Sequence, residues 1–216
     1  LSLLPLLIWG SRISLLVGFS ATVISMVLST AVGIASGHFR GLLRALLERL
    51  TDWFLVIPFL PLVIVLATVL SRGLLTVIVV IGVTSWPGTA RLIRSQTLTV
   101  EERPYIDRAR ALGAGDWHIM TRHVLPNVMP LVLANTVLTV AVAILSETTL
   151  SFLGLGVPFS TTWGTLIEGA FSHGAISRGA WWYLLPPGIC VIAVVLAFTL
   201  VGRALEQIFD PRLRER

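Results

Sequence analysis

The sequence predicts an all-α fold: a polytopic membrane helix bundle with five spans in this chain. Of its 216 residues, 55% are hydrophobic and only 12% are charged, about half the charged share of a soluble domain. The mean hydropathy is +0.89, and apolar runs recur at about the 20 residues that a helix needs to cross a bilayer. Because lipid allows a helix to be apolar on every side, these features exclude a soluble enzyme.

The expected spans follow the apolar runs in order: 13–37, 53–70, 74–90, 127–150 and 182–202. The first run has no charged residue, and the second contains Pro58 and Pro61. Pro87 lies near the end of the third, Glu147 lies in the fourth, and the fifth holds the single cysteine, Cys190. Prolines are tolerated in a span where neighbouring helices satisfy the freed carbonyls, so we expect kinks within a packed bundle.

The arginines predict the orientation in the inner (plasma) membrane. Thirteen of the sixteen lie in segments 38–52, 91–126 and 203–216, and the other three are Arg12, Arg72 and Arg178. Basic residues stay preferentially on the cytoplasmic side, so these three segments, including the C-terminus, are expected there. Leu1 and the loop 151–181 are then outside, which leads us to expect a sixth span ahead of Leu1. Topology also explains the basic charge without a nucleic-acid partner.

Residue usage excludes several chemistries. The chain has no lysine, so it lacks both a phosphate-binding loop and a Schiff-base residue, and any ATP must be bound by another chain. His118 and His123 are five residues apart, a spacing that does not share one α-helical face, which argues against a metal pair. We therefore expect no enzyme activity, no cofactor and no metal.

The longest predicted cytoplasmic segment, 91–126, is punctuated as two short helices with a turn between them. Glu101 and Glu102 favour a helix start, Gly113 suits a left-handed cap, Asp116 is a good N-cap, and Pro126 ends the second helix. The turn is expected to present small residues and three apolar anchors to another protein: Ala111, Leu112, Gly113 and Ala114, with Leu112, Trp117 and Met120 as anchors. A basic helix pair lying on anionic lipid is the alternative.

The string YIDRARALGAGDWHIMTRHVLPN, residues 105–127, resembles the cytoplasmic signature of binding-protein-dependent ABC importer permeases. That signature reads Glu-Ala-Ala, three residues, Gly, nine residues, an apolar position, any residue, Leu-Pro. Asp107 stands in the Glu position, Ala109 in that of the second Ala, and Gly113 in that of the Gly, before the closing pair Leu125–Pro126. Two positions depart from it: Arg108 replaces the first Ala, and His123 the apolar residue.

Further strings, among them RLTDWFLVIPFLPLVIVLA, WPGTARLIRSQ, ILSETTLSFLGLGV and DPRLR, resemble the second permease subunit of the dipeptide, oligopeptide and nickel systems. The resemblance implies one permease domain, 1–216, whose coupling loop, about 94–126, docks on an ATP-hydrolysing subunit. The positions it implies for that loop, chiefly within 101–126, are Asp107, Ala109, Ala111, Leu112, Gly113, Ala114, Asp116, Leu125 and Pro126.

The resemblance also implies the assembly: a heterodimer with a related permease, two ATP-binding cassette subunits and an external solute-binding protein. The implied cargo is a di- or oligopeptide moved by alternating access, with nickel, haem, glutathione or another small solute as alternatives. An ion-driven secondary transporter is a hypothesis from another class, but it calls for midplane charges and an inverted repeat that the sequence does not show.

Two features near the predicted outer side remain. Glu147 is the only carboxylate inside a span; about 20 residues from the inner side, it is expected near the outer interface, within reach of water. It is interpreted as a structural residue that pairs with a neighbour or lies at a helix end, or as a gate or outer-interface contact. The external loop 151–181 is expected to meet a binding protein or the pore mouth, with a helix lying on the membrane surface as the alternative. Gly18, Gly33 and Gly37 are expected at close helix contacts.

Overall fold

The computed structural model describes residues 3–209, and this part of the chain is helical throughout apart from its connections. The predicted all-α class is confirmed, since no strand occurs among the described residues. The helices are α1 (Leu3–His38), α2 (Leu42–Val56), α3 (Phe59–Val69), α4 (Leu74–Glu101), α5 (Pro104–Ala111), α6 (Asp116–Ile119), the π-helical turn η1 (Met120–Val124), α7 (Leu125–Phe152), α8 (Trp163–Ser172) and α9 (Trp181–Phe209).

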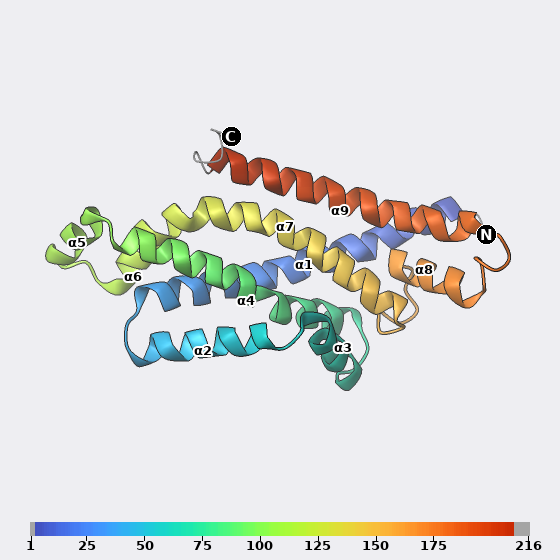
Figure 1. Cartoon of the computed structure of the whole chain (residues 1–216), viewed down its shortest axis with the longest axis horizontal. Coiled ribbons are helices and arrows are strands. Elements are labelled where there is room, and N and C mark those ends of the chain that lie inside the picture. The colour runs from blue at the N-terminus through green and yellow to red at the C-terminus, as the bar shows by residue number, and fades with distance from the viewer. Residues whose placement is uncertain (1–2, 210–216) are drawn as a thin grey trace.

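The long helices α1, α4, α7 and α9 run lengthwise through the molecule (Figure 1). At one end, which we call the loop end, lie α5 and α6 together with the last turns of α1, α4 and α9. At the opposite end, the α8 end, α8 lies beside the start of α1 and of α9. The described parts of the three arginine-rich segments therefore lie at the loop end or start from it. Arg212, Arg214 and Arg216 fall outside the described residues.

Four of the five expected spans are continuous helices long and apolar enough to cross a membrane, and the fifth is broken. The expected span 53–70 is divided between α2 and α3, which meet at 91°. A residue that precedes a proline is driven out of the helical region, and Ile57, before Pro58, has extended backbone angles of φ −76° and ψ 125°. The kink expected at the prolines is thus a break between two helices. Residues 42–52, expected in a cytoplasmic segment between spans, form most of α2.

The helices also extend beyond the apolar runs that predicted them. α4 continues past residue 90 to Glu101, and α1 begins well before residue 13. Hydropathy marks where lipid can cover a helix, but a helix continues wherever its polar side chains find partners. On α4, Arg91 and Arg94 do so by pairing with carboxylates of α2.

A very close helix contact joins α1 to α4 through glycines. A Cβ added to Gly33 would lie 2.8 Å from the carbonyl oxygen of Ala90, and one on Gly37 would lie 2.6 Å from Cγ2 of Thr97. On α7, Ile144 would meet a Cβ on Gly18 at 2.5 Å. The prediction that these three glycines lie at helix contacts is confirmed, since only the missing side chain lets the backbones approach so closely.

We expect Gly33→Ala to destabilise the bundle by about 1–3 kcal/mol, because its methyl group must displace backbone of α4. Gly88→Ala is the matched control. Gly88 lies on α4, and no atom lies within 4 Å of the position that an added Cβ would take, so this change should be neutral or gain about 0.5–1 kcal/mol in helix propensity. Thermal unfolding of the purified protein in detergent measures both; equal melting temperatures would contradict the close packing.

Candidate functional site

The loop end carries a turn whose conformation depends on glycine. After α5, Gly113 has a φ of +85°, its N–H donates to the carbonyl of Arg110 at 2.9 Å, and the N–H of Ala114 donates to the carbonyl of Ala109 at 3.0 Å. This pair of bonds is the Schellman motif, which satisfies the last carbonyls of a helix through a left-handed residue. The predicted left-handed cap at Gly113 is confirmed. We call residues 112–115 the elbow.

Other predicted boundaries of this loop are wrong. Glu101 is the last residue of α4 and Glu102 its C-cap, while α5 begins at Pro104. Asp116 is not the N-cap of α6, since Gly115 holds that position and no side chain caps the helix. The reason is tertiary: the side chains of Glu101 and Asp116 both turn toward the end of α1, as described below.

Pro126 does not end the second helix. The chain is helical without interruption from Asp116 to Phe152, through α6, η1 and α7. A proline removes a backbone donor and crowds the carbonyl four residues earlier, here that of Arg122, which lies in η1. The π-helical turn widens the helix at that carbonyl and so lets the helix continue into α7.

The same turn changes the relative placement of His118 and His123, whose spacing predicted different faces of the helix. A π-helix brings residues five apart onto one face, and the rings of His118 and His123 lie edge to face with centroids 5.6 Å apart. Tyr105 of α5 lies 6.0 Å from His123. Among the described residues, no group of three or more metal-ligating side chains is close enough to hold a metal ion.

Two large apolar side chains project into solvent here: Leu112 of the elbow is 89% exposed, and Trp117 in the first turn of α6 is 76% exposed. Beneath them lies an open groove of about 600 Å³, lined by Tyr105, Arg108, Ala109, residues 112–115, His118 and His123. Ala111, Asp107, Asp116 and Pro126 are exposed, whereas Ala109, Ala114 and Leu125 are half-buried. Of the predicted contact residues, Ala109, Leu112, Gly113 and Ala114 line this groove. Met120, expected as an anchor, packs against the buried cluster of the bundle instead, and Leu125 and Pro126 lie on the helix that leads away from the loop.

The loop is anchored by one apolar side chain on each side of the elbow. Ile106 of α5 is fully buried and Ile119 of α6 nearly so. They join a cluster that includes Val100 of α4, Val124 of η1 and Ile34 of α1. Burial of this kind stabilises by about 25 cal/mol for each Å² of apolar surface removed from water. These two side chains therefore hold the base of the loop against the bundle, while its tip is exposed.

A charged network, which the sequence did not reveal, joins the loop to the ends of α1 and α4. The Nδ1 atom of His38 lies 2.6 Å from Oε1 of Glu101, and its Nε2 atom lies 3.3 Å from Oδ1 of Asp116. Arg110 of α5 donates to the other carboxylate oxygen of Glu101. We call these four residues the His38 network. Their separation along the chain, from 38 to 116, left no local signal.

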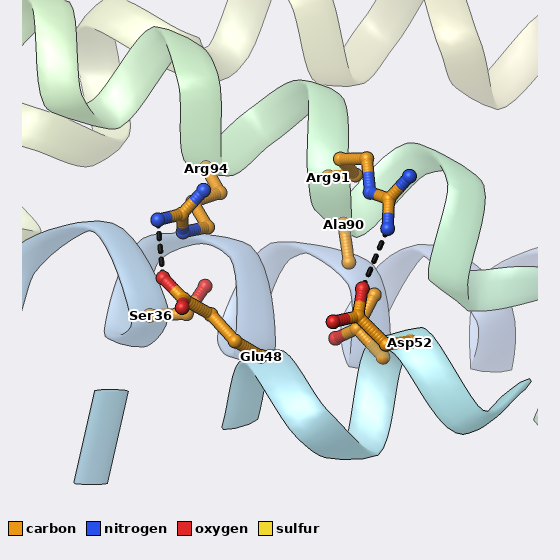
Figure 2. A pocket seen from close by; sticks show the side chains of 7 residues that line it. Ser36, Glu48, Asp52, Ala90, Arg91 and Arg94 are labelled. Carbon is orange, nitrogen blue, oxygen red and sulfur yellow. Dashed lines mark hydrogen bonds and ion pairs between the residues drawn. The ribbon is translucent and has the colours of Figure 1, made fainter. Parts of the chain in front are cut away.

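A second charged site lies between α2 and α4, around a cavity of about 280 Å³ (Figure 2). Arg91 donates to Asp52 at 2.6 Å, and Arg94 donates to Glu48. Both arginines point from α4 toward α2, as Figure 2 shows, and Ser36 of α1 also lines the cavity. From the sequence, Arg91 and Arg94 indicated only which side of the membrane their segment faces. In the structure they form ion pairs that join α4 to α2.

At the α8 end, Glu147 is fully buried. The hydroxyl of Ser14 on α1 donates to its Oε2 at 2.9 Å, and that of Ser151 donates to its Oε1 at 2.6 Å. The expectation that water reaches this carboxylate is wrong, because α1 and the segment before α8 cover it. The N–H of Trp163 faces the Ser14 hydroxyl at 3.4 Å, and its indole donates to the carbonyl of Leu7 at 3.1 Å.

Within the loop 151–181, one face of α8 is buried. Trp163, Gly164, Leu166 and Ala170 are its buried residues, and a Cβ on Gly164 would lie 2.5 Å from the carbonyl oxygen of Thr148 on α7. Thr162 caps the helix by accepting from the N–H of Thr165. The structure therefore packs α8 against α7 rather than leaving it detached from the bundle.

We expect Glu147→Ala to destabilise the α8 end by about 2–5 kcal/mol, because it leaves a cavity and two buried hydroxyls without an acceptor. Trypsin should then cut faster after Arg178, which is exposed in the segment following α8. Glu168→Ala, a change to a half-buried carboxylate on α8 itself, should leave the rate unchanged. Unchanged cleavage in Glu147→Ala would contradict the bridging role.

The chain is similar to proteins of one transport family. Residues 29–215 match the family described as "Binding-protein-dependent transport system inner membrane component". A putative peptide transport system permease protein of Brucella suis is 36% identical over 96% of this chain and 69% of its own length. The di/tripeptide transport system permease protein DppC of Pseudomonas aeruginosa is 37% identical over 98% of this chain and 69% of its own length.

Among solved structures, the fold is similar to a chain of the MetNI methionine ABC transporter in inward-facing conformations. The TM-score is 0.73 and the identity 20%, over 95% of this chain and 96% of that one. At this identity the likeness concerns the fold alone. With the family match over most of the chain and the relatives above 30% identity, it leads to one conclusion: the chain belongs to the binding-protein-dependent inner membrane permeases of ABC transport systems.

Proposed function

We propose that this ABC importer permease is driven through the elbow by separate ATPase subunits and that it moves di- or oligopeptides by alternating access. The exposed elbow, with Trp117 just after it, carries the proposal. Leu112 and Trp117 are largely exposed although both are large and apolar. Such side chains are the usual anchors of a protein interface, because their burial provides much of its binding free energy.

The backbone of the elbow suits a close contact. No atom lies within 4 Å of a Cβ position on Gly113 or Gly115, so a partner surface would meet bare backbone there. The Schellman motif and the buried anchors Ile106 and Ile119 fix the shape of the turn before a partner arrives. A preformed contact loses less entropy on binding, so the partner's movement would be transmitted rather than absorbed.

The energy source follows from the same picture. A chain without lysine has no phosphate-binding loop of the Walker type, so ATP hydrolysis is assigned to the ATPase subunits. Their closure would displace the elbow. The helices on either side of it, α5 with the preceding α4 and α6–η1–α7, would carry the displacement along the bundle. Opening to one side at a time is then a rigid-body transition between two packings.

Orientation, partners and cargo complete the proposal. In the proposed orientation the loop end faces the cytoplasmic side of the inner membrane. Segments 38–52 and 91–126 and the C-terminus are then cytoplasmic. A related permease forms the second half of a heterodimer, and an external solute-binding protein meets the α8 end, where loop 151–181 lies. Peptide cargo is supported by the names of the relatives, and nickel, haem, glutathione or another small solute is the alternative.

We expect Gly113→Val to abolish both the uptake of a labelled dipeptide and the stimulation of ATPase activity by cargo, while the protein still inserts in the membrane. A β-branched residue at φ +85° costs about 1–2 kcal/mol locally and places a side chain on the contact surface. Co-purification of the ATPase subunits and uptake in reconstituted vesicles measure the effect.

Gly174→Val is the matched control for this experiment. Gly174 ends α8 in the same motif, with a φ of +65°, bonds from residues 174 and 175 to Phe171 and Ala170, and free space around it. It therefore suffers the same backbone strain at the opposite end of the bundle. We expect it to retain the ATPase subunits. Normal uptake by Gly113→Val, or loss of the ATPase subunits from both variants, would contradict docking at the elbow.

A further inference from the structure

His38 is the last residue of α1, and only 2% of its side chain is exposed. Both of its ring nitrogens face carboxylates from other elements: Glu101 at the end of α4 and Asp116 at the start of α6. Glu101 lies just before α5, which leads into the elbow, and Asp116 lies just after the elbow. One buried imidazole therefore joins the two sides of that loop to a third helix.

We propose that His38 is the positioning residue that couples the elbow to α1 and α4, so that a displacement of the loop becomes a displacement of the helix pair. The inference rests on the proposed function, since it presupposes that a partner moves the elbow. It assigns to a residue outside the loop a role in passing the movement on.

The chemistry of the network favours a directional joint. An ionised carboxylate only accepts hydrogen bonds, so the Nδ1–H of His38 donates to Glu101, and the Nε2 atom faces the carboxylate of Asp116 at 3.3 Å. Arg110 adds a donor from α5 to the same Glu101, which brings α5 into the joint. Charge-assisted bonds of this kind are stronger and more dependent on geometry than apolar contacts.

The apolar anchors alone do not supply this link. Ile106 and Ile119 pack into a cluster with Val100, Val124 and other side chains, and apolar contacts can slide because they are not directional. The side chain of Glu101 is 11% exposed, whereas that of Asp116 is 68% exposed. The hydrogen bond to Glu101 is therefore the buried half of the joint, and the longer contact with Asp116 is the half that a moving α6 would stretch or break.

The close packing of α1 and α4 near His38 favours movement of the two helices as one unit. Gly33 and Gly37 bring α1 into close contact with α4 in the last turns before His38. A shift of Glu101 would therefore reach α1 through the imidazole and through this close contact at once. Packed helices have discrete arrangements rather than continuous ones, so a small displacement at the joint would select between two packings of the bundle.

The test uses the assembled transporter with its ATPase subunits and binding protein in vesicles, and it measures dipeptide uptake and the stimulation of ATPase activity by cargo-loaded binding protein. His38→Ala should retain the ATPase subunits but lower uptake and stimulation roughly tenfold, within the usual range of coupling between sites. His38→Arg, which places several hydrogen-bond donors at the same position, should restore both to within about threefold of the parent.

Neighbouring carboxylates give a matched pair. Glu101→Gln removes the charge from the network and should lower stimulation about as much as His38→Ala. Glu102→Gln changes the adjacent carboxylate, which is exposed and forms no ion pair among residues 3–209, and it should have no effect. If His38→Ala does not assemble, Asp116→Asn, at an exposed position, serves in its place and should lower stimulation about threefold.

Two outcomes separate this inference from the proposed function. If Gly113→Val uncouples the transporter but His38→Ala, Glu101→Gln and Asp116→Asn all show normal stimulation, the role of His38 is overturned and docking at the elbow stands. If Gly113→Val transports normally, the proposed function itself fails. Failure of His38→Arg to recover, with Glu102→Gln equally impaired, would reduce His38 to a structural residue and overturn the inference.

Discussion

The close approach of α1 and α4 is the constraint on which the rest of the structure depends. Gly33 and Gly37 remove the side chains that would hold the two backbones apart, and the register they set places His38 beside Glu101. The same contact brings α4 near α2, so that Asp52 can pair with Arg91. Without that approach, the His38 network would lose its geometry although every residue in it was still present.

The loop end and the α8 end use different physics for similar tasks. At the loop end, charges at partly exposed positions join elements, and the side chain of Leu112 is exposed to solvent. At the α8 end, Glu147 is fully enclosed and is satisfied by the hydroxyls of Ser14 and Ser151. Joints with exposed members can open and close at little cost, whereas a buried carboxylate without its partners is expensive. The loop end is therefore suited to movement and the α8 end to fixed packing.

Features that depend on local chemistry were predictable from the sequence: the apolar runs, and the left-handed cap at Gly113, which follows from a glycine after a short helix. Features set by neighbours were not. Pro58 breaks a span instead of kinking it, and Pro126 is accommodated by η1, which also brings His118 toward His123. Glu147 is buried because α1 and α8 cover it, and the pattern of apolar residues in α7 alone gives no sign of that cover.

The most direct test of the account is a cross-link from the elbow. With Cys190 replaced by alanine, Leu112→Cys becomes the only cysteine of this chain, and a short bifunctional reagent can join it to an ATPase subunit in the assembled transporter. The account predicts an efficient cross-link whose yield changes when ATP is added. A cysteine at this position that forms no cross-link in the intact assembly, or that is labelled by an impermeant reagent from outside the cell, would contradict it.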